Sequence, residues 1–207
     1  MYTPEYFKMS DKDEIFDFIN KNSFAILVSE NEGKINATHL PVLLKKDEGE
    51  KGFLYAHVAK ANRQWENIDD EVLVIFPGEH KYISSSWYET NQTVPTWNYL
   101  SVHVYGRIKI LHDIEDKISI IKSVVKYFED DDSNYSVEEL KPGYFEGLLR
   151  GIVAFKIEIT DIQGKKKISQ NHPAHRQQKV IEHLEKIADE DSLKIAEKMK
   201  NNLKLNQ

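Results

Sequence analysis

The chain has 207 residues, of which 40% are hydrophobic and 30% charged, which is typical of a globular protein with a sizeable core. Its net charge of −6 argues against direct DNA binding, because DNA binders gather lysine and arginine to displace the counterions of phosphates. The absence of cysteine excludes disulfides, thiolate metal ligands and cysteine nucleophiles.

The N-terminal half begins with a predicted helix and continues with strands. Ser10 precedes two acidic residues and then apolar residues at helical spacing, so we expect a short amphipathic helix over residues 11–21. Pro41 interrupts one of the strands that follow, which indicates an edge or a bulge. The strand candidates are Phe24–Ser29, Ile35–Leu44, Gly52–Val58, Val72–Phe76, Ser101–Ile110 and Gly151–Ile159.

Three further helices are expected. An apolar stripe at three- and four-residue intervals predicts one over residues 115–128. From about Gln177 onward the pattern predicts two amphipathic helices joined at Asp189–Asp191.

The order of these elements predicts the fold class. Turns, and not helices, separate most of the strands, which favours an antiparallel sheet over a doubly wound parallel one. We therefore expect a mainly β member of the α+β class, a six-stranded antiparallel split β-barrel with flanking helices. Residues 1–170 would form the barrel domain, and residues 171–207 a helical extension packed on it or on a dimer.

The sequence indicates a cytoplasmic protein. No run of about 18 apolar residues is present, so we expect no membrane span. The first residues lack a basic start followed by an apolar run, which argues against a secretory signal. The lack of cysteine fits a reducing compartment.

Several common motifs are missing. The chain has no Gly-x-Gly-x-x-Gly, no Gly-Lys-Ser/Thr loop and no Gly-x-Ser-x-Gly, which excludes the usual dinucleotide fingerprint, the P-loop and the nucleophile elbow. His172 and His175 are the nearest approach to metal-ligand spacing. Because Pro173 lies between them, we interpret them as surface histidines and predict no metal site.

The segment Tyr82–Gly106 is the most informative part of the chain. It holds two of the three tryptophans, four tyrosines and several serines and threonines. Aromatic faces beside hydroxyl groups suit either a planar heteroaromatic ligand or a tight subunit interface.

Three polar groups of residues are candidate sites. The pair Thr38-His39 in an apolar strand either lines a cavity or is a cross-strand threonine beside a core histidine. The run from His57 to Trp65 is either an anion cradle or a surface loop capped at Asn62. The run Lys167–Asn171 carries amides that suit a ring with carbonyl and imide groups.

Taken in order, these motifs resemble the PaiB family, the FMN-binding negative transcriptional regulators of bacteria. The resemblance runs from Met1 to about Lys186 and rests on the following motifs: Thr38-His39-Leu40-Pro41, His57 with Asn62-x-Gln64-Trp65, Tyr82-Ile83-Ser84 with Trp87-Tyr88, Val94-Pro95-Thr96-Trp97-Asn98-Tyr99, Gly151-Ile152-Val153, and Lys167-Ile168-Ser169-Gln170-Asn171.

The resemblance implies an FMN-binding split β-barrel related to pyridoxamine phosphate oxidase, working as a homodimer with flavin at the subunit interface. It also implies negative regulation of sporulation and of extracellular protease production. The site residues it implies fall into three sets. Four edge the isoalloxazine ring (Thr38, His39, Leu40, Pro41), four hold the phosphate (His57, Lys60, Asn62, Arg63), and four complete the ring pocket (Trp97, Asn98, Gln170, Asn171).

The function itself has alternatives. With no helix-turn-helix pattern visible, regulation would act indirectly, through flavin or redox state. The fold also suits an FMN-dependent reductase or oxidase, for which His39 and His103 are the available acid–base groups, or a haem-handling protein.

Overall fold

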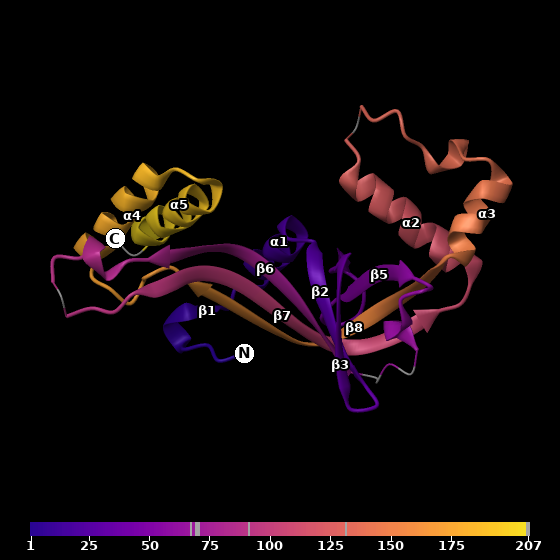
Figure 1. The fold of residues 1–207 in the computed structure, drawn as a ribbon, viewed down its shortest axis with the longest axis horizontal. Coiled ribbons are helices and arrows are strands. Elements are labelled where there is room, and N and C mark those ends of the chain that lie inside the picture. Colours follow the sequence, from indigo (N-terminus) through magenta and orange to yellow (C-terminus); the bar gives the residue numbers. More distant parts are fainter. Residues whose placement is uncertain (67, 69–70, 91, 131, 206–207) are drawn as a thin grey trace. The chain divides into compact units, whose positions relative to one another are not determined.

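The computed structural model describes residues 1–66, 68, 71–90, 92–130 and 132–205 as an α+β fold dominated by one sheet (Figure 1). The described strands are β1 (Lys8–Met9), β2 (Phe24–Asn31), β3 (Lys34–Pro41), β4 (Leu43–Lys45), β5 (Phe53–Ala59), β6 (Glu71–Ile83), β7 (Thr96–Leu111) and β8 (Ile152–Lys167). The described helices are α1 (Lys12–Lys21), α2 (Ile114–Phe128), α3 (Pro142–Arg150), α4 (Ala174–Ile187) and α5 (Glu190–Leu205).

The sheet has the strand order β3-β2-β6-β7-β8-β5-β4, with β1 added on β8. Every pair whose register is described is antiparallel. The prediction of an antiparallel, mainly β fold is therefore confirmed, whereas the predicted count of six strands is wrong, since eight strands are described.

Two local features explain the different count. The expected strand over 35–44 is two strands, because Val42 leaves the ladder and donates its N–H to the carbonyl of Ser23 at 2.8 Å. β1 has only two residues, too few for a period-2 pattern to reveal it.

The helix predictions differ from the structure mainly at their ends. Asp11, and not Ser10, caps α1, since its carboxylate accepts the N–H of Glu14 at 2.8 Å. α3 was not predicted, because its Pro-Gly start resembles a turn, although proline is well suited to a first helical position. α4 begins directly after Pro173, three residues before the expected start.

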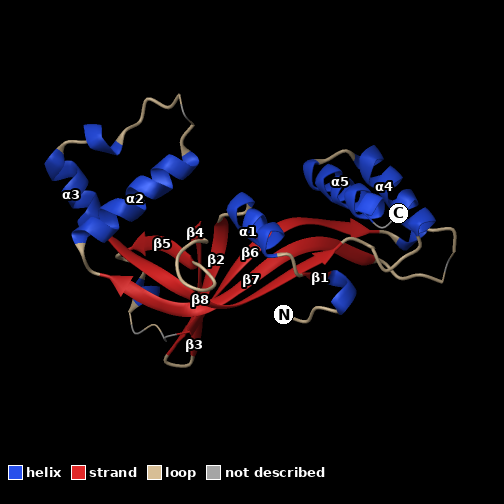
Figure 2. Ribbon diagram, turned by 180° about the vertical axis from the view of Figure 1, so that it is seen from behind, coloured by secondary structure: helices blue, strands red, loops and turns tan. Residues whose placement is uncertain are grey.

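The chain divides into two compact units. Unit 1 comprises Met1–Phe18, Pro77–Val102 and Gln163–Gln207, and unit 2 comprises Ile19–Phe76 and His103–Ile162. In unit 1, α4 and α5 lie side by side (Figures 1 and 2) and bury Val180, Ile181, Leu184, Ile195 and Met199. The link between them contains Ala188 at φ 58°, in the left-handed region. The domain boundary expected at residue 170 stays a prediction, and residues 206–207 lie outside the described part.

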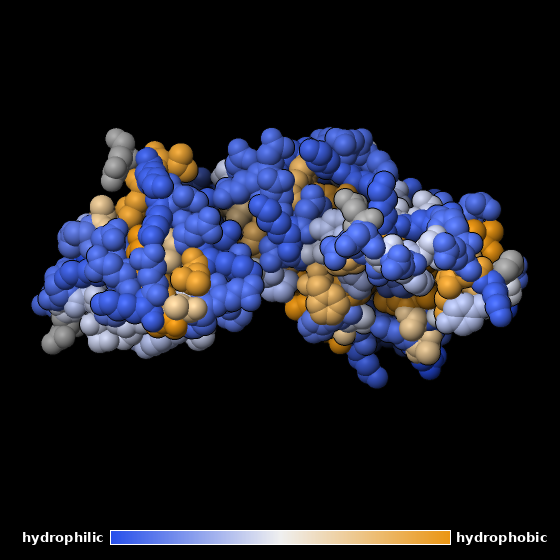
Figure 3. Space-filling model, turned by 90° about the horizontal axis from the view of Figure 1, so that it is seen from above, coloured by the Kyte–Doolittle hydropathy of each residue, from blue (hydrophilic) through white to orange (hydrophobic). Residues whose placement is uncertain are grey.

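In unit 2, α2 packs on the sheet. Leu111, Ile120 and Ala154 form a buried cluster, with Tyr55 and Val124 against it. On the face drawn in Figure 3, hydrophilic residues predominate and hydrophobic ones gather in separate patches. None of the described helices combines the length and the apolar character that crossing a bilayer requires.

Candidate functional site

Gln64 is the centre of a buried polar cluster in unit 2. It lies in a short 3-10 turn (Arg63–Trp65) after β5 and is 6% exposed. Its amide nitrogen lies 3.2 Å from the carbonyl of Leu27, 2.9 Å from Ser29 Oγ and 3.3 Å from the carbonyl of Asn36. The turn is thereby joined to β2 and β3.

Thr38 extends this cluster. Its hydroxyl donates to Gln64 Oε1 at 2.5 Å and accepts from Asn62 Nδ2 at 2.8 Å. Asn62 Oδ1 in turn accepts the backbone N–H of Gln64 at 3.0 Å, so Asn62 is the cap that the sequence suggested. A capping role for Asn62 and a binding role for the loop are compatible, because the cap fixes the backbone beside Lys60 and Arg63.

A hollow of about 450 Å³ lies beside the cluster. Thr38, Asn62 and Arg63, three of the predicted site residues, line it. It is bordered by Asn31, Glu32, Lys34, Asn36, Ala37, Thr38, Asn62, Arg63, Gln64 and Glu66. Its charges are mixed, and the Arg63 guanidinium bonds Glu66 at 2.8 Å.

Lys60 stands on the same loop. Its N–H donates to the carbonyl of Gly151 at 2.8 Å, and its carbonyl accepts from the indole of Trp65 at 3.1 Å. Its side chain is exposed, and no ion pair within the described part of the chain uses its ammonium group. The backbone is therefore fixed while the cation remains available.

His57, at the end of β5, is mostly removed from solvent. Burial lowers the pKa of its imidazole, and Nδ1 has no hydrogen-bond partner within the described residues. Tyr55, two residues earlier, shares its face of the strand and packs against the cluster under α2.

The rest of the Thr38–Pro41 motif divides between surface and core. Leu40 is 3% exposed and belongs to the core, whereas His39 is exposed and has the ring of Phe24 at 6.2 Å. The alternative of a hydrogen-bonded core histidine at position 39 is therefore excluded.

In unit 1, Asn98 and Asn171 line one hollow of about 410 Å³. Asn98 is fully buried, and its amide exchanges hydrogen bonds with the hydroxyl of Ser169 at 2.9 and 3.1 Å. The remaining lining residues are Phe7, Gln92, Thr93, Val94, Thr96, Lys167, Ser169, His172 and Arg176.

Trp97 and Gln170 do not line this hollow. Trp97 follows the strand alternation to the opposite face of β7 and borders a different hollow. The Gln170 amide is used locally, accepting the N–H of Ile168 at 2.8 Å and donating to the carbonyl of Lys166 at 2.6 Å. The roles expected for these two residues stay predictions.

Lys167 begins the candidate run Lys167–Asn171, but the sequence assigned it no role of its own, because it also ends a run of three lysines, which is typical of a solvated loop. In the structure it ends β8, lines the Asn98 hollow and donates to the hydroxyl of Thr96. Burial lowers the pKa of its ammonium group. The alternation of side chains along β8 was the one signal that could have distinguished it from its neighbours.

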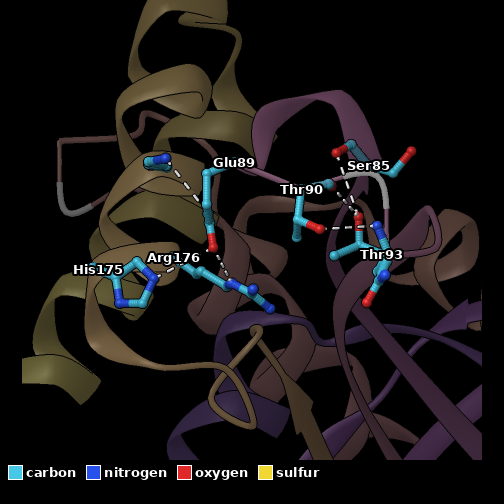
Figure 4. A network of polar contacts seen from close by, with 8 residues as sticks. Ser85, Glu89, Thr90, Thr93, His175 and Arg176 are labelled. Carbon is cyan, nitrogen blue, oxygen red and sulfur yellow. Dashed lines mark hydrogen bonds and ion pairs between the residues drawn. The ribbon is translucent and has the colours of Figure 1, made fainter.

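A polar network fixes the rim of this hollow (Figure 4). Glu89 accepts from Arg176 at 2.6 Å and lies 3.5 Å from His175 and 3.4 Å from Lys179. Thr93 bonds the carbonyls of Ser85 and Thr90, both at 3.5 Å. The segment before β7 is thus held to α4, although Asn91 lies outside the described residues.

The class of protein follows from comparison with known families. Residues 1–161 match the family described as "Putative FMN-binding domain". This match covers more than half of the chain, and FMN is the cofactor it identifies.

The relatives narrow the class. The chain is 39% identical over 206 residues to "Protease synthase and sporulation protein PAI 2" of Bacillus subtilis, with 99% of each chain covered. An uncharacterized protein of Aspergillus fumigatus is 27% identical over 88% of this chain and 90% of its own. The chain therefore belongs to the PaiB family of FMN-binding proteins, as its motifs indicated.

Solved structures agree on the fold. The flavocytochrome Anf3 of Azotobacter vinelandii superposes with a TM-score of 0.62 at 14% identity, covering 80% of this chain and 72% of that one. A putative 5-nitroimidazole antibiotic resistance protein of Bacteroides thetaiotaomicron gives 0.57 at 17% identity, covering 76% and 85%. At these identities the likeness concerns the fold alone.

The residues of unit 2 fit the phosphate end of FMN. Lys60 and Arg63 provide an ammonium and a guanidinium group, the two cations that bind phosphate oxygens best in proteins. The unpaired Nδ1 of His57 is a buried polar atom that a ligand can satisfy.

Proposed function

We propose that this protein binds one FMN per chain, with the phosphate held at the loop after β5. Lys60 and Arg63 supply the charges, and His57 and Asn62 supply neutral polar contacts. The motif Thr38–Pro41 lies along the edge of the isoalloxazine ring, where exposed His39 and the backbone of the strand end are available. When bound, FMN supplies one- and two-electron redox chemistry.

The observation that carries the proposal is the Gln64 cluster. It fixes the backbone of the phosphate loop by side-chain bonds to β2 and β3 before any ligand arrives. A loop ordered in advance loses little conformational entropy on binding, which raises affinity without additional contacts.

The second part of the proposal is a cytoplasmic homodimer of split barrels with flavin at the subunit interface. In that dimer the hollow of Asn98 and Asn171 faces the ring of the flavin bound to the other subunit. Amide groups suit the carbonyl and imide edge of the ring. Lys167, in the same hollow, would face the part of the ring that becomes anionic on reduction.

Regulation is the biological role we propose, following the name of the Bacillus subtilis relative. Lysine and arginine are spread along an acidic chain, so the role is indirect and is read from the flavin or its redox state. The rate of NAD(P)H oxidation distinguishes this role from an FMN-dependent reductase. With an enzyme the rate would exceed that of free FMN, and with a flavin-binding regulator the two rates would be equal.

The test is a fluorescence titration of FMN with purified protein, since bound flavin changes its emission. We expect saturation at one FMN per chain and a loss of affinity of about 10- to 100-fold for each of Lys60→Ala and Arg63→Ala, because each removes a charge-assisted hydrogen bond. Lys126→Ala, on exposed α2 surface, is the matched control and should leave the affinity unchanged. A folded protein that shows no flavin affinity would refute the proposal.

A further inference from the structure

A third hollow lies in unit 1, on the face of β7 opposite Asn98. Its volume is about 540 Å³, within the range of small-molecule sites. Its lining comes from β6, β7, the link between α4 and α5, and the start of α5. It consists of His80, Lys81, Tyr82, Trp97, Asp189, Glu190 and Asp191. Of these residues, the sequence analysis placed Trp97 in the flavin pocket, and the flavin contacts proposed above include none of them.

Three rings form one wall. Trp97 is 52% exposed and Tyr82 44% exposed. The Trp97 ring lies 6.0 Å from His80, tilted by 34°, and 5.9 Å from Tyr82, edge to face. A large indole face therefore remains open to the hollow, and indole is the aromatic surface that attracts cations most strongly.

Three consecutive carboxylates form the facing wall. Lys81 binds Asp189 and lowers its pKa to about 2, so this group is ionised and already paired. Glu190 bonds Lys194 at 2.6 Å. Asp191 has the weakest described ion pair of the three carboxylates, a contact with His80 Nδ1 at 3.9 Å.

We propose that this hollow binds a small organic cation, an alkylammonium ion whose charged nitrogen lies between the Trp97 ring and the Asp191 carboxylate. The alkyl stem would lie along Tyr82, whose exposed ring offers apolar surface. Lys81, an alkylammonium group of the chain itself, already binds a carboxylate of the same lining.

Charge decides against an anionic occupant. The lining carries three carboxylates and one ammonium group, so a phosphate-bearing ligand would be repelled. A purely apolar occupant would contact the aromatic rings but form no favourable interaction with the carboxylates. An alkylammonium ion interacts favourably with both. The site is thus chemically distinct from the phosphate loop of unit 2.

The test is NMR of the three indole N–H signals, with n-butylammonium as the probe and 1-butanol as its neutral match. The Trp97 signal is identified by its loss in Trp97→Phe. We expect a saturable shift of this signal with butylammonium, with Kd of about 1 mM, and none with butanol. Asp191→Asn should weaken binding about tenfold or more, because a charged acceptor is removed.

Two controls separate the site from general effects. Glu182→Asn, which removes a carboxylate on exposed α4 surface, should leave butylammonium binding unchanged. FMN affinity should be the same in Asp191→Asn as in the parent protein, which keeps this proposal independent of the flavin site. The proposal would be overturned by equal shifts with butanol, by shifts that do not saturate, or by undiminished binding in Asp191→Asn. Loss of the proposed dimer in Trp97→Phe would also overturn it, because the hollow would then be part of a subunit interface.

Discussion

Gln64 and Glu89 are both polar hubs, but they lie in opposite environments. Gln64 is buried, neutral and bonded to β2 and β3, whereas Glu89 lies at the surface and gathers three basic side chains (Figure 4). A buried neutral hub contributes mainly because its partners would otherwise lack hydrogen bonds. An exposed charged hub contributes little and varies with pH and salt. The two hubs should therefore respond differently to substitution.

The largest effect should come from Gln64→Leu. The change removes every described hydrogen bond of the Gln64 side chain and leaves Ser29 and Thr38 without this partner. We expect the free energy of unfolding to fall by about 2–4 kcal/mol, measured by urea denaturation without FMN.

Gln178→Leu is the matched control. Gln178 is an exposed glutamine whose described side-chain bond is to Glu182 at 3.4 Å, so the loss should stay within about 0.5 kcal/mol. Equal losses in the two variants would mean that the Gln64 cluster has no special stabilising role.

Thr38→Val should have the next largest effect, about 1–1.5 kcal/mol, since it keeps the shape and removes one hydroxyl from the same cluster. The double variant with Gln64→Leu should cost less than the sum of the two, because the residues share a bond. Urea denaturation of all four proteins completes this cycle, and strict additivity would show that the hydroxyl acts independently of Gln64.

Glu89→Gln should lower Tm by less than Thr38→Val and should do so in a pH-dependent way. Hydrogen bonds from its own backbone N–H and from Arg176 lower the pKa of Glu89 from 4.5 to about 2. A depressed carboxyl pKa stabilises the fold above pH 4.5, and this contribution is lost as the pH falls toward 2. The Tm difference between parent and variant should therefore have its largest value at pH 6 and should shrink to zero as the pH falls from 4.5 to 2. A Tm difference that does not change with pH would contradict the assignment.

The smallest effect should come from Lys179→Gln. This residue lies 3.4 Å from Glu89, and Arg176 remains bound at 2.6 Å after the change. We expect a Tm within experimental error of the parent in moderate salt, where an exposed pair is screened. A loss as large as that of Glu89→Gln would mean that Lys179 is the main partner of the carboxylate.

Much of the fold was predictable because it depends on local periodicity. The apolar stripe of α2 predicted its helix to within a few residues, and the apolar strand segments predicted where most of the strands lie. The extensions of β6, β7 and β8 were not predicted, because their added residues are largely polar or aromatic and lack a simple apolar alternation. The start of α3 was missed because Pro-Gly is as typical of turns as proline is of first helical turns.

The site was less predictable than the fold. Motif order predicted a phosphate role for the loop after β5, which stays a prediction. No local pattern shows that Gln64 is the buried anchor of this loop, since its partners come from β2 and β3, more than 25 residues away. Two neighbouring residues that were predicted to share one pocket also lie in different ones. Trp97 and Asn98 were expected to close one pocket, and the alternation of a strand directs their side chains to different hollows.

Ala188, between α4 and α5, offers a simple engineering opportunity. It holds a backbone conformation that costs a residue with a Cβ atom about 1–2 kcal/mol and costs glycine almost nothing. Glycine also gains freedom in the unfolded chain, so the net benefit of Ala188→Gly should be below about 1 kcal/mol. The chain thus keeps a slightly strained C-cap after α4, where glycine, one nucleotide away from alanine in the genetic code, would be more stable.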